Sequence, residues 1–350
     1  MEHRKTHEFF CQPGPRRSRN SSANFSLASL RAARHLYCDM PLPIRPIFGS
    51  LVCLALTLSP AHASDLAVTH SDDGLLILSS FANAPFPHPA RAEGHRHNND
   101  FFSAAEHYQD STVALFAPTG FHAGNTVDFV VHFHGWNNNV TNALKKYRLP
   151  DQFAASRRNA ILIVPEGPRN ADDSFGGKLE DPGGFARFMD EAMQTLRERQ
   201  TIPKEAKIGR IILSGHSGGY EVISAIVACG GLTDHVQEVW LFDALYAHAE
   251  RFALWFDHHP GRFIDLYTAH GGTKDETENL MTALTENHVP FFAGKEGAAA
   301  PEDLRRNRLV FLFSELPHDE VLQAHRTFQT FLETSGLKAV KTIYKTAPKP

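Results

Sequence analysis

One serine stands inside a cluster of glycines in the middle of the chain, in the segment IILSGHSGGYEVISAIVACGG that spans residues 211–231. Gly215 precedes Ser217 by two residues and Gly219 follows it by two, which gives the pattern G-x-S-x-G. The residues before it have strand character, and those after it repeat at helical spacing. The apolar face of this helix is made by Val222, Ile223, Ile226 and Val227.

A strand that turns this sharply into a helix needs glycines beside the serine, because a Cβ there would strike the neighbouring backbone. The serine hydroxyl then points outward. The backbone N–H groups and the positive dipole end of the following helix face any anion that forms beside it. The pattern therefore predicts a serine nucleophile, and the alternative is a glycine-rich turn with a capping serine.

The elements that must position this serine follow from the rest of the pattern. Eight apolar runs have strand character, namely GLLILSSF, STVALFAP, TVDFVVHFHG, NAILIVPEG, GRIILSGHSGG, EVWLFDALY, GRFIDLYTAHGG and RLVFLFSELPH. Helical patterns lie between them, among them GGFARFMDEAMQTLRER and RFALWFDHH, and a final helix is expected in DEVLQAHRTFQTFLETSG. This alternation predicts an α/β fold with a mostly parallel, doubly wound central sheet of about eight strands flanked by helices.

In such sheets ligands bind at the carboxyl ends of the strands, so the residues that follow each strand are the candidates for chemistry. These residues, in chain order, are His134-Gly135-Trp136, Ser217, Asp243, Asp275 and His318. A serine, an acid and a histidine thus occur in that order, each after a different strand.

Most of the chain, from about residue 75 to 335, resembles the esterase and lipase kind of α/β-hydrolase. The resemblance rests on GHSGG as the nucleophile elbow, HFHGW as a His-Gly loop after the third strand, and LPHDEV as a late histidine before a terminal helix. It implies acyl transfer without a cofactor: His318 would take the proton of Ser217, and a carboxylate would orient the imidazole. The backbone N–H of Gly218 and one from Gly135–Trp136 would form the oxyanion hole.

Two residues could supply the carboxylate. Asp243 directly follows an apolar strand and is favoured, and Asp275 in the loop GGTKDETE is the alternative acid. Each could instead cap the helix that follows it. His216, beside the serine, is expected to be a packing residue.

Other functions stay open at this point. An amidase or peptidase would use the same triad, and a non-catalytic binding protein could share the fold. A metal-dependent hydrolase could be built on His132 and His134, because H-x-H is a known ligand spacing. Trp136 with the three asparagines at residues 137–139 could be a platform for a sugar or other polar substrate, or a surface turn.

The amino-terminal segment predicts export. Residues 1–39 read as a disordered or misannotated extension, and residues 40–63 read as a signal peptide with cleavage after Ala63. We therefore expect a secreted or periplasmic protein with one domain over residues 64–350 and no stable membrane insertion. Its single cysteine would be Cys229, so no intramolecular disulfide can form.

Charge and loop lengths limit the partners. A formal net charge of −4 excludes nucleic acid as the main partner. Short connections between the strands favour an open site and a small-molecule or polymer-attached ester as substrate. The segment 81–108, rich in Pro, His and Asn, could pack along the domain or cover the site.

Overall fold

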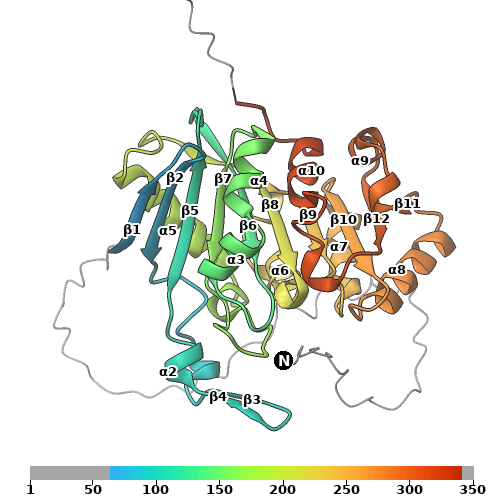
Figure 1. The fold of residues 1–350 in the computed structure, drawn as a ribbon, viewed down its shortest axis with the longest axis horizontal. Coiled ribbons are helices and arrows are strands. Elements are labelled where there is room, and N and C mark those ends of the chain that lie inside the picture. Colours follow the sequence, from blue (N-terminus) through green and yellow to red (C-terminus); the bar gives the residue numbers. More distant parts are fainter. Residues whose placement is uncertain (1–63, 341–350) are drawn as a thin grey trace, which may run out of the picture.

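The computed structural model describes residues 64–340 and contains a ten-stranded sheet with helices on both faces (Figure 1). All eight runs predicted to be strands lie in this sheet: β2 (Gly74–Ser80), β5 (Thr112–Pro118), β6 (Thr126–Phe133), β7 (Ile161–Pro165), β8 (Lys207–His216), β9 (Val236–Phe242), β10 (Arg262–Thr268) and β12 (Leu309–Ser314). The prediction missed one strand at each edge, β1 (Ser64–His70) and β11 (Phe292–Lys295). A lone edge strand buries little apolar surface, so its hydrophobic pattern is weak.

The strands follow the order β1-β2-β5-β7-β6-β8-β9-β10-β12-β11. All neighbouring strands from β7 to β11 in this order are parallel, whereas β1, β2, β5 and β7 pair antiparallel. The sheet is therefore mixed but mostly parallel, as predicted. Phe133 is in register with Gly215, and His216 with Phe242, so the residues that follow β6, β8 and β9 begin at the same level.

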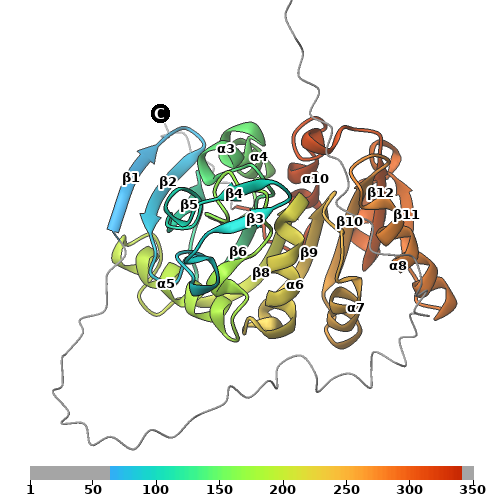
Figure 2. The ribbon, with the colours of Figure 1, turned by 90° about the horizontal axis from the view of Figure 1, so that it is seen from below.

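Helices cover both faces of the sheet, as the doubly wound prediction requires. One face carries α5 (Gly184–Glu198), α6 (Tyr220–Cys229), α7 (Ala249–His258) and α8 (Lys274–Glu286), and the other carries α3 (Val140–Lys146), α4 (Leu149–Ser156), α9 (Pro301–Arg306) and α10 (Thr327–Thr334). Figure 2 shows α5, α6 and α7 along one side and α3, α4 and α10 along the other. Alternate strand residues supply the two cores: Phe129 and Val131 pack with the first group and Val130 with the second.

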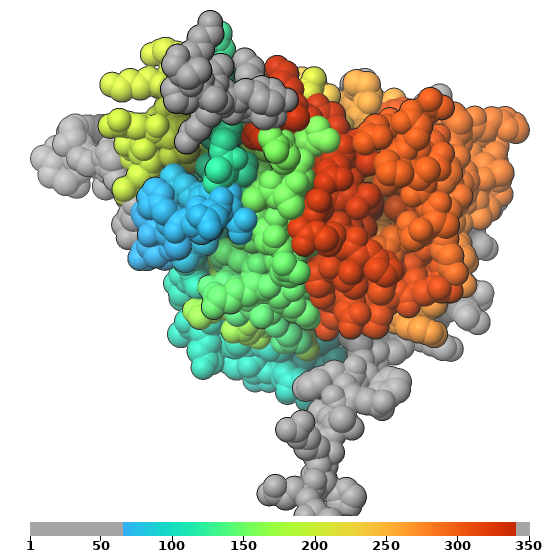
Figure 3. Space-filling view, turned by 45° about the horizontal axis from the view of Figure 1, so that its top comes forward, coloured from blue at the N-terminus to red at the C-terminus, as the bar shows by residue number. Residues whose placement is uncertain are grey.

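The final helix differs from its prediction. The expected continuous helix is divided into a short 3₁₀ turn, His318–Glu320, and α10, which begins only at Thr327. Arg326 has a left-handed backbone with φ of 53°, which an L-residue cannot adopt inside an α-helix. In the space-filling view the C-terminal residues, drawn in red, lie beside the green part of the chain that contains α4 (Figure 3).

The segment 81–108 forms a small insertion between β2 and β5. It contains the hairpin of β3 (His95–His97) and β4 (Asp100–Phe102), followed by α2 (Ala104–His107). Figure 1 shows the hairpin beyond one end of the sheet's strands. The rings of His97 and Trp136 lie 4.9 Å apart, so the insertion reaches the loop that follows β6.

The predicted extension and signal peptide, residues 1–63, lie outside the described residues. Within residues 64–340, no helix is both long and apolar enough to cross a membrane.

Candidate active site

Ser217 stands on a turn that the glycines make possible. β8 ends at His216, a 3₁₀ turn spans Ser217–Gly219, and α6 begins at Tyr220. Ser217 has φ of 53°, an uncommon left-handed conformation for a residue with a side chain. A Cβ at Gly219 would lie 2.6 Å from the carbonyl oxygen of Phe133, and one at Gly215 would lie 2.7 Å from Ile223 Cδ1. The turn therefore requires glycine at both positions and leaves the serine partly exposed.

Asp243, which follows β9, is fully buried and completely hydrogen-bonded. Its Oδ1 accepts from the backbone N–H of Thr268 at 3.1 Å and from the hydroxyl of Thr273, and its Oδ2 accepts from Thr268 Oγ1 at 2.8 Å. Oδ2 also lies 2.6 Å from His318 Nδ1. Burial alone would raise the pKa of Asp243, but the hydrogen bonds from His318 and the two threonines outweigh it and hold the pKa below its usual range. The group is therefore a carboxylate.

His318 presents one ring nitrogen to Asp243 and leaves the other available. Because Asp243 is a carboxylate, Nδ1–H donates to it, and in the neutral ring Nε2 then carries the lone pair. Within the described residues, no hydrogen bond joins Ser217 to His318. The serine hydroxyl lies beside Gly135, where an added Cβ would be 3.0 Å from it. Catalytic hydrogen bonds are often long or misaligned before substrate binds.

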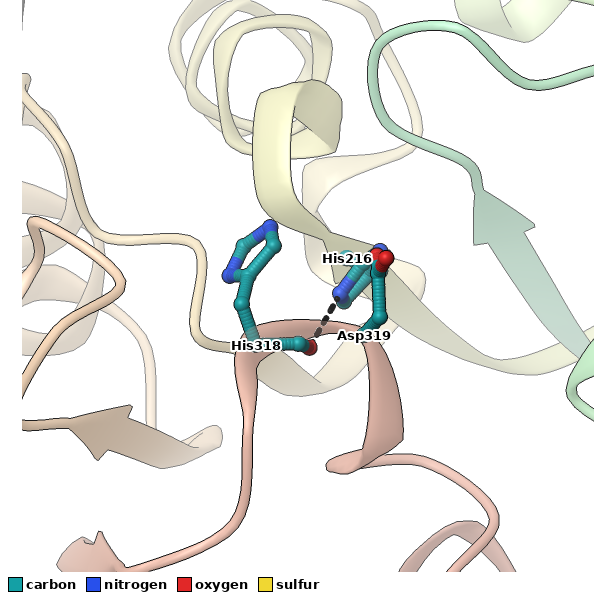
Figure 4. A group of neighbouring side chains, drawn as sticks. All are labelled: His216, His318 and Asp319. Atoms are coloured by element: carbon teal, nitrogen blue, oxygen red, sulfur yellow. Dashed lines mark hydrogen bonds between the residues drawn. The ribbon is translucent and has the colours of Figure 1, made fainter. Parts of the chain in front are cut away.

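His216 is buried, as expected for a packing residue, and it also holds the loop that carries His318. Its Nε2–H donates to the carbonyl oxygen of His318 at 3.0 Å, and its Nδ1 accepts from the Tyr147 hydroxyl at 3.1 Å. Burial lowers the pKa of His216 to about 3, so the ring is neutral. Figure 4 shows His216 beside the backbone of His318, with the imidazole of His318 turned away from Asp319.

The loop after β6 packs directly on the serine. A Cβ at Gly135 would lie 2.5 Å from Ser217 Cβ, and one at Gly218 would lie 2.7 Å from Trp136 Cδ1. Among the residues the structure describes, no acceptor binds the backbone N–H of Gly135 or Trp136. These N–H groups are therefore available beside the serine.

A buried histidine–glutamate contact holds this loop, and the backbone nitrogen of Gly167 lies 3.1 Å from the same His134 Nε2. His134 and Glu166 are 7% and 3% exposed, and His134 Nε2 lies 3.0 Å from Glu166 Oε1. Burial disfavours the charged ring, but the hydrogen bond and charge of Glu166 outweigh it and raise the pKa of His134. His134 Nδ1–H donates to the carbonyl of Gly135 at 2.9 Å. Since C=O and N–H point opposite ways in a trans peptide, this bond also fixes the direction of the Trp136 N–H.

Sequence reasoning missed Glu166. It lies 32 residues from His134, and the two meet only because β6 and β7 are neighbours in the sheet. The available signal was its position directly after the apolar strand ILIVP, where a charged residue must find a partner.

The structure separates His132 from His134. His132 packs in the core beside Tyr147 and Phe328, with Nδ1 at 2.9 Å from Ser214 Oγ. His134 lies beyond the end of β6. Of the described residues, the group that could place three ligands around a metal ion is His216, His318 and Asp319, which contains neither. Within residues 64–340, His132 and His134 therefore have no third ligand beside them. In the group that was found, both nitrogens of His216 are already hydrogen-bonded.

The alternative acid and the asparagines have other places. Asp275 is exposed in the first turn of α8, whose N-cap position is held by Thr273 without a side-chain capping bond. Asp243 caps no helix, because α7 begins at Ala249 with His248 as its cap. All three asparagine side chains make hydrogen bonds within the protein, to partners that include Asp172, Asn142 and Asn170.

This arrangement, a serine on a strand-turn-helix elbow followed in chain order by an acid and a histidine after later strands, is that of the α/β-hydrolase fold. No model of a known protein family matches the sequence, and no curated protein matches it.

Three solved structures illustrate what the fold is similar to. A feruloyl esterase module from Clostridium thermocellum, complexed with sinapinate, has 10% identity and a TM-score of 0.45 over 79% of this chain and 95% of its own. An S-formylglutathione hydrolase from Agrobacterium tumefaciens has 10% identity and a TM-score of 0.41 over 77% and 96%. A fluorophosphonate-binding serine hydrolase of Staphylococcus aureus has 10% identity and a TM-score of 0.42 over 78% and 99%. These values are too low to assign a function.

Proposed function

We propose that this protein is an exported serine hydrolase that cleaves carboxylic esters through an acyl-enzyme on Ser217, with His318 as base and Asp243 as the acid. The observation that carries the proposal is the 2.6 Å contact between Asp243 Oδ2 and His318 Nδ1. It fixes the neutral imidazole in the tautomer whose free Nε2 can accept a proton.

In the first half of the reaction, Ser217 Oγ attacks the ester carbonyl carbon while its proton passes to His318 Nε2. The imidazolium that forms is stabilised by the carboxylate of Asp243. The C–O bond to the alcohol then breaks, and His318 returns the proton to the leaving oxygen. Ser217 now carries the acyl group. For the hydrogen bond between Ser217 Oγ and His318 Nε2 to form, the serine hydroxyl must turn from Gly135 toward His318.

Negative charge develops on the carbonyl oxygen during this step. We assign the backbone N–H groups of Gly218 and Trp136 as the donors to this oxygen, because both residues pack against Ser217 or its turn. One such donor is worth about 3–4 kcal/mol of transition-state stabilisation. The His134–Glu166 pair acts through the backbone and is a positioning pair for this oxyanion hole.

In the second half, His318 takes a proton from water, and the hydroxide equivalent attacks the acyl carbon. Collapse of this intermediate releases the carboxylic acid and returns the proton from His318 to Ser217. Apart from this water, the groups assigned to the cycle are side chains and backbone N–H groups of the chain itself.

The proposed export rests on the sequence of residues 40–63. It predicts that the protein found outside the cytoplasm begins at Ser64. N-terminal sequencing of the protein recovered from the periplasm or the medium tests it, and retention of residues 40–63 would contradict it.

A pair of substrates tests the reaction type. We expect the purified protein to hydrolyse p-nitrophenyl butyrate much faster than the p-nitroanilide of the same acid, with no loss of rate in EDTA. A faster anilide reaction would replace the esterase by an amidase with the same triad. Loss of activity in EDTA, with full activity in Ser217→Ala, would contradict the serine mechanism.

A further inference from the structure

Two exposed aromatic side chains flank the proposed catalytic residues. Among the described residues, Trp136 and Tyr246 are both 36% exposed, which places them with the most exposed large hydrophobic side chains. Trp136 packs on Gly218, next to the serine, and the ring of Tyr246 lies 6.4 Å from that of His318. An exposed tryptophan beside the proposed nucleophile offers a contact surface to a ligand, since burying a ring contributes strongly to binding.

The ring of Trp136 is held in place. Its Nε1–H donates to Ser174 Oγ at 2.7 Å, and the His97 ring of the β3–β4 hairpin packs against it at 68°. The single polar atom of the indole is thus engaged, and the ring presents carbon atoms to a ligand. A preformed ring also costs less conformational entropy on binding.

A buried carboxylate joins the 81–108 insertion to the loop that carries Ser174, the hydrogen-bond partner of Trp136. Asp173, 7% exposed, accepts two hydrogen bonds from Arg91 at 2.7 and 3.0 Å and one from the Tyr108 hydroxyl at 3.0 Å. The guanidinium of Arg91 also lies 4.6 Å from the ring centroid of Phe175. These contacts fasten the insertion to the loop that carries Ser174, so the insertion that reaches Trp136 is part of a fixed site.

The polar groups beside Trp136 do not favour a sugar. Asn138 and Asn139 use both the oxygen and the nitrogen of their side-chain amides within the protein, and the exposed Asn137 donates to Asp172, so most of the amide groups here are not available to the several hydroxyls of a carbohydrate. A planar apolar ring needs no such partners.

We propose that Trp136 is the platform for an aromatic ring carried by the acyl part of the substrate, an inference that rests on the proposed ester hydrolysis. The carbonyl oxygen must lie at Gly218, on which Trp136 packs, whereas the leaving oxygen must lie at His318, beside Tyr246. With the leaving group directed to the side of His318 and Tyr246, the proposal assigns the acyl chain to the other side of the serine, where Trp136 lies.

The test compares two methyl esters that differ only in the ring. For methyl 3-phenylpropanoate we expect kcat/KM to exceed that for methyl 3-cyclohexylpropanoate by about three- to tenfold, carried by KM. Trp136→Leu should bring the ratio close to one. The matched control is Phe101→Leu, which removes a hairpin ring that is 51% exposed and paired with Arg96 rather than with Trp136, and it should leave the ratio unchanged.

Tryptophan fluorescence gives a readout that needs no catalysis. The chain has three tryptophans, and Trp240 and Trp255 are 0% and 2% exposed, so acrylamide quenching reports on Trp136. We expect 3-phenylpropanol to protect Trp136 from quenching and 3-cyclohexylpropanol to protect it much less. If the aromatic alcohol protects Trp136 in a protein that has no esterase activity, the proposed function is contradicted, but the binding of an aromatic ring at Trp136 is supported. Ester hydrolysis with equal rates for both esters and equal protection would overturn the platform alone.

Discussion

Asp243 Oδ2 and His318 Nδ1 lie 2.6 Å apart although β9 and β12, which carry them, are not neighbours in the sheet. β10 lies between these strands, and the residues that follow it surround the carboxylate. Thr268 and Thr273 donate to Asp243, and a Cβ at Gly271 would lie 1.8 Å from Oδ2. Three strand ends therefore build one rigid acid–histidine pair.

Asp243→Asn should lower kcat by about 10⁴-fold, because an amide no longer favours the useful tautomer of His318 or stabilises its charged form. The matched change, Asp275→Asn, alters the exposed carboxylate that follows the next strand, β10, and should leave kcat unchanged. Steady-state hydrolysis of p-nitrophenyl butyrate measures both. Equal losses in the two variants would contradict the assignment of Asp243.

Gly135→Ala should lower kcat at least 100-fold while the protein still folds. The new methyl group would lie 2.5 Å from Ser217 Cβ, so the loop must move away from the serine and take its N–H groups with it. Gly124→Ala is the control, since its Cβ would meet its nearest atom at 3.9 Å. Normal kcat in Gly135→Ala would show that this loop does not contribute to the reaction.

The His134–Glu166 pair should stabilise the fold in a pH-dependent way. The pKa of His134 is raised in the folded state, so its contribution is fully present below its unfolded pKa of about 6.5 and is lost as the pH rises through the folded pKa. Breaking a buried pair costs about 3–5 kcal/mol.

A double-mutant cycle of His134→Gln and Glu166→Gln, measured by urea unfolding at several pH values, tests this. The coupling energy should be largest below about pH 6.5 and decline at higher pH. A coupling energy that is independent of pH would show that His134 is neutral throughout.

Asp265→Asn should stabilise the protein at neutral and alkaline pH. Asp265 is fully buried, accepts from the Thr277 hydroxyl at 2.6 Å, and has no partner for Oδ1 among the described residues. Burial raises its pKa to about 7, so its folded form binds a proton that the unfolded form has released.

The wild type therefore loses stability as the pH rises from about 4 to 7, and the variant should not. The difference in the free energy of unfolding should grow over this interval, reach the order of a few kcal/mol, and stay constant above pH 7. A variant less stable than the wild type at pH 8 would contradict this ionisation scheme.

The sequence places its candidate catalytic groups at strand ends, and their catalytic roles are predictions that the activity and labelling experiments test. Ser217, Asp243 and His318 each come within a few residues of a different apolar run, and parallel strands bring such ends to one edge. Glu166 was missed because its role depends on which strands are neighbours. The hairpin of residues 95–102 was missed because its strands are three residues long and carry no apolar alternation. The break before α10 covers the turn residues 321–325 and the left-handed Arg326, which the helical pattern conceals.

Labelling of the purified protein with a fluorophosphonate probe tests the central claim most directly, because only an activated serine reacts with it. We predict that the wild type is labelled and that Ser217→Ala and His318→Ala are not, although both remain folded. A folded wild-type protein that stays unlabelled, or labelling that persists in Ser217→Ala, would contradict the assignment of Ser217 as the nucleophile.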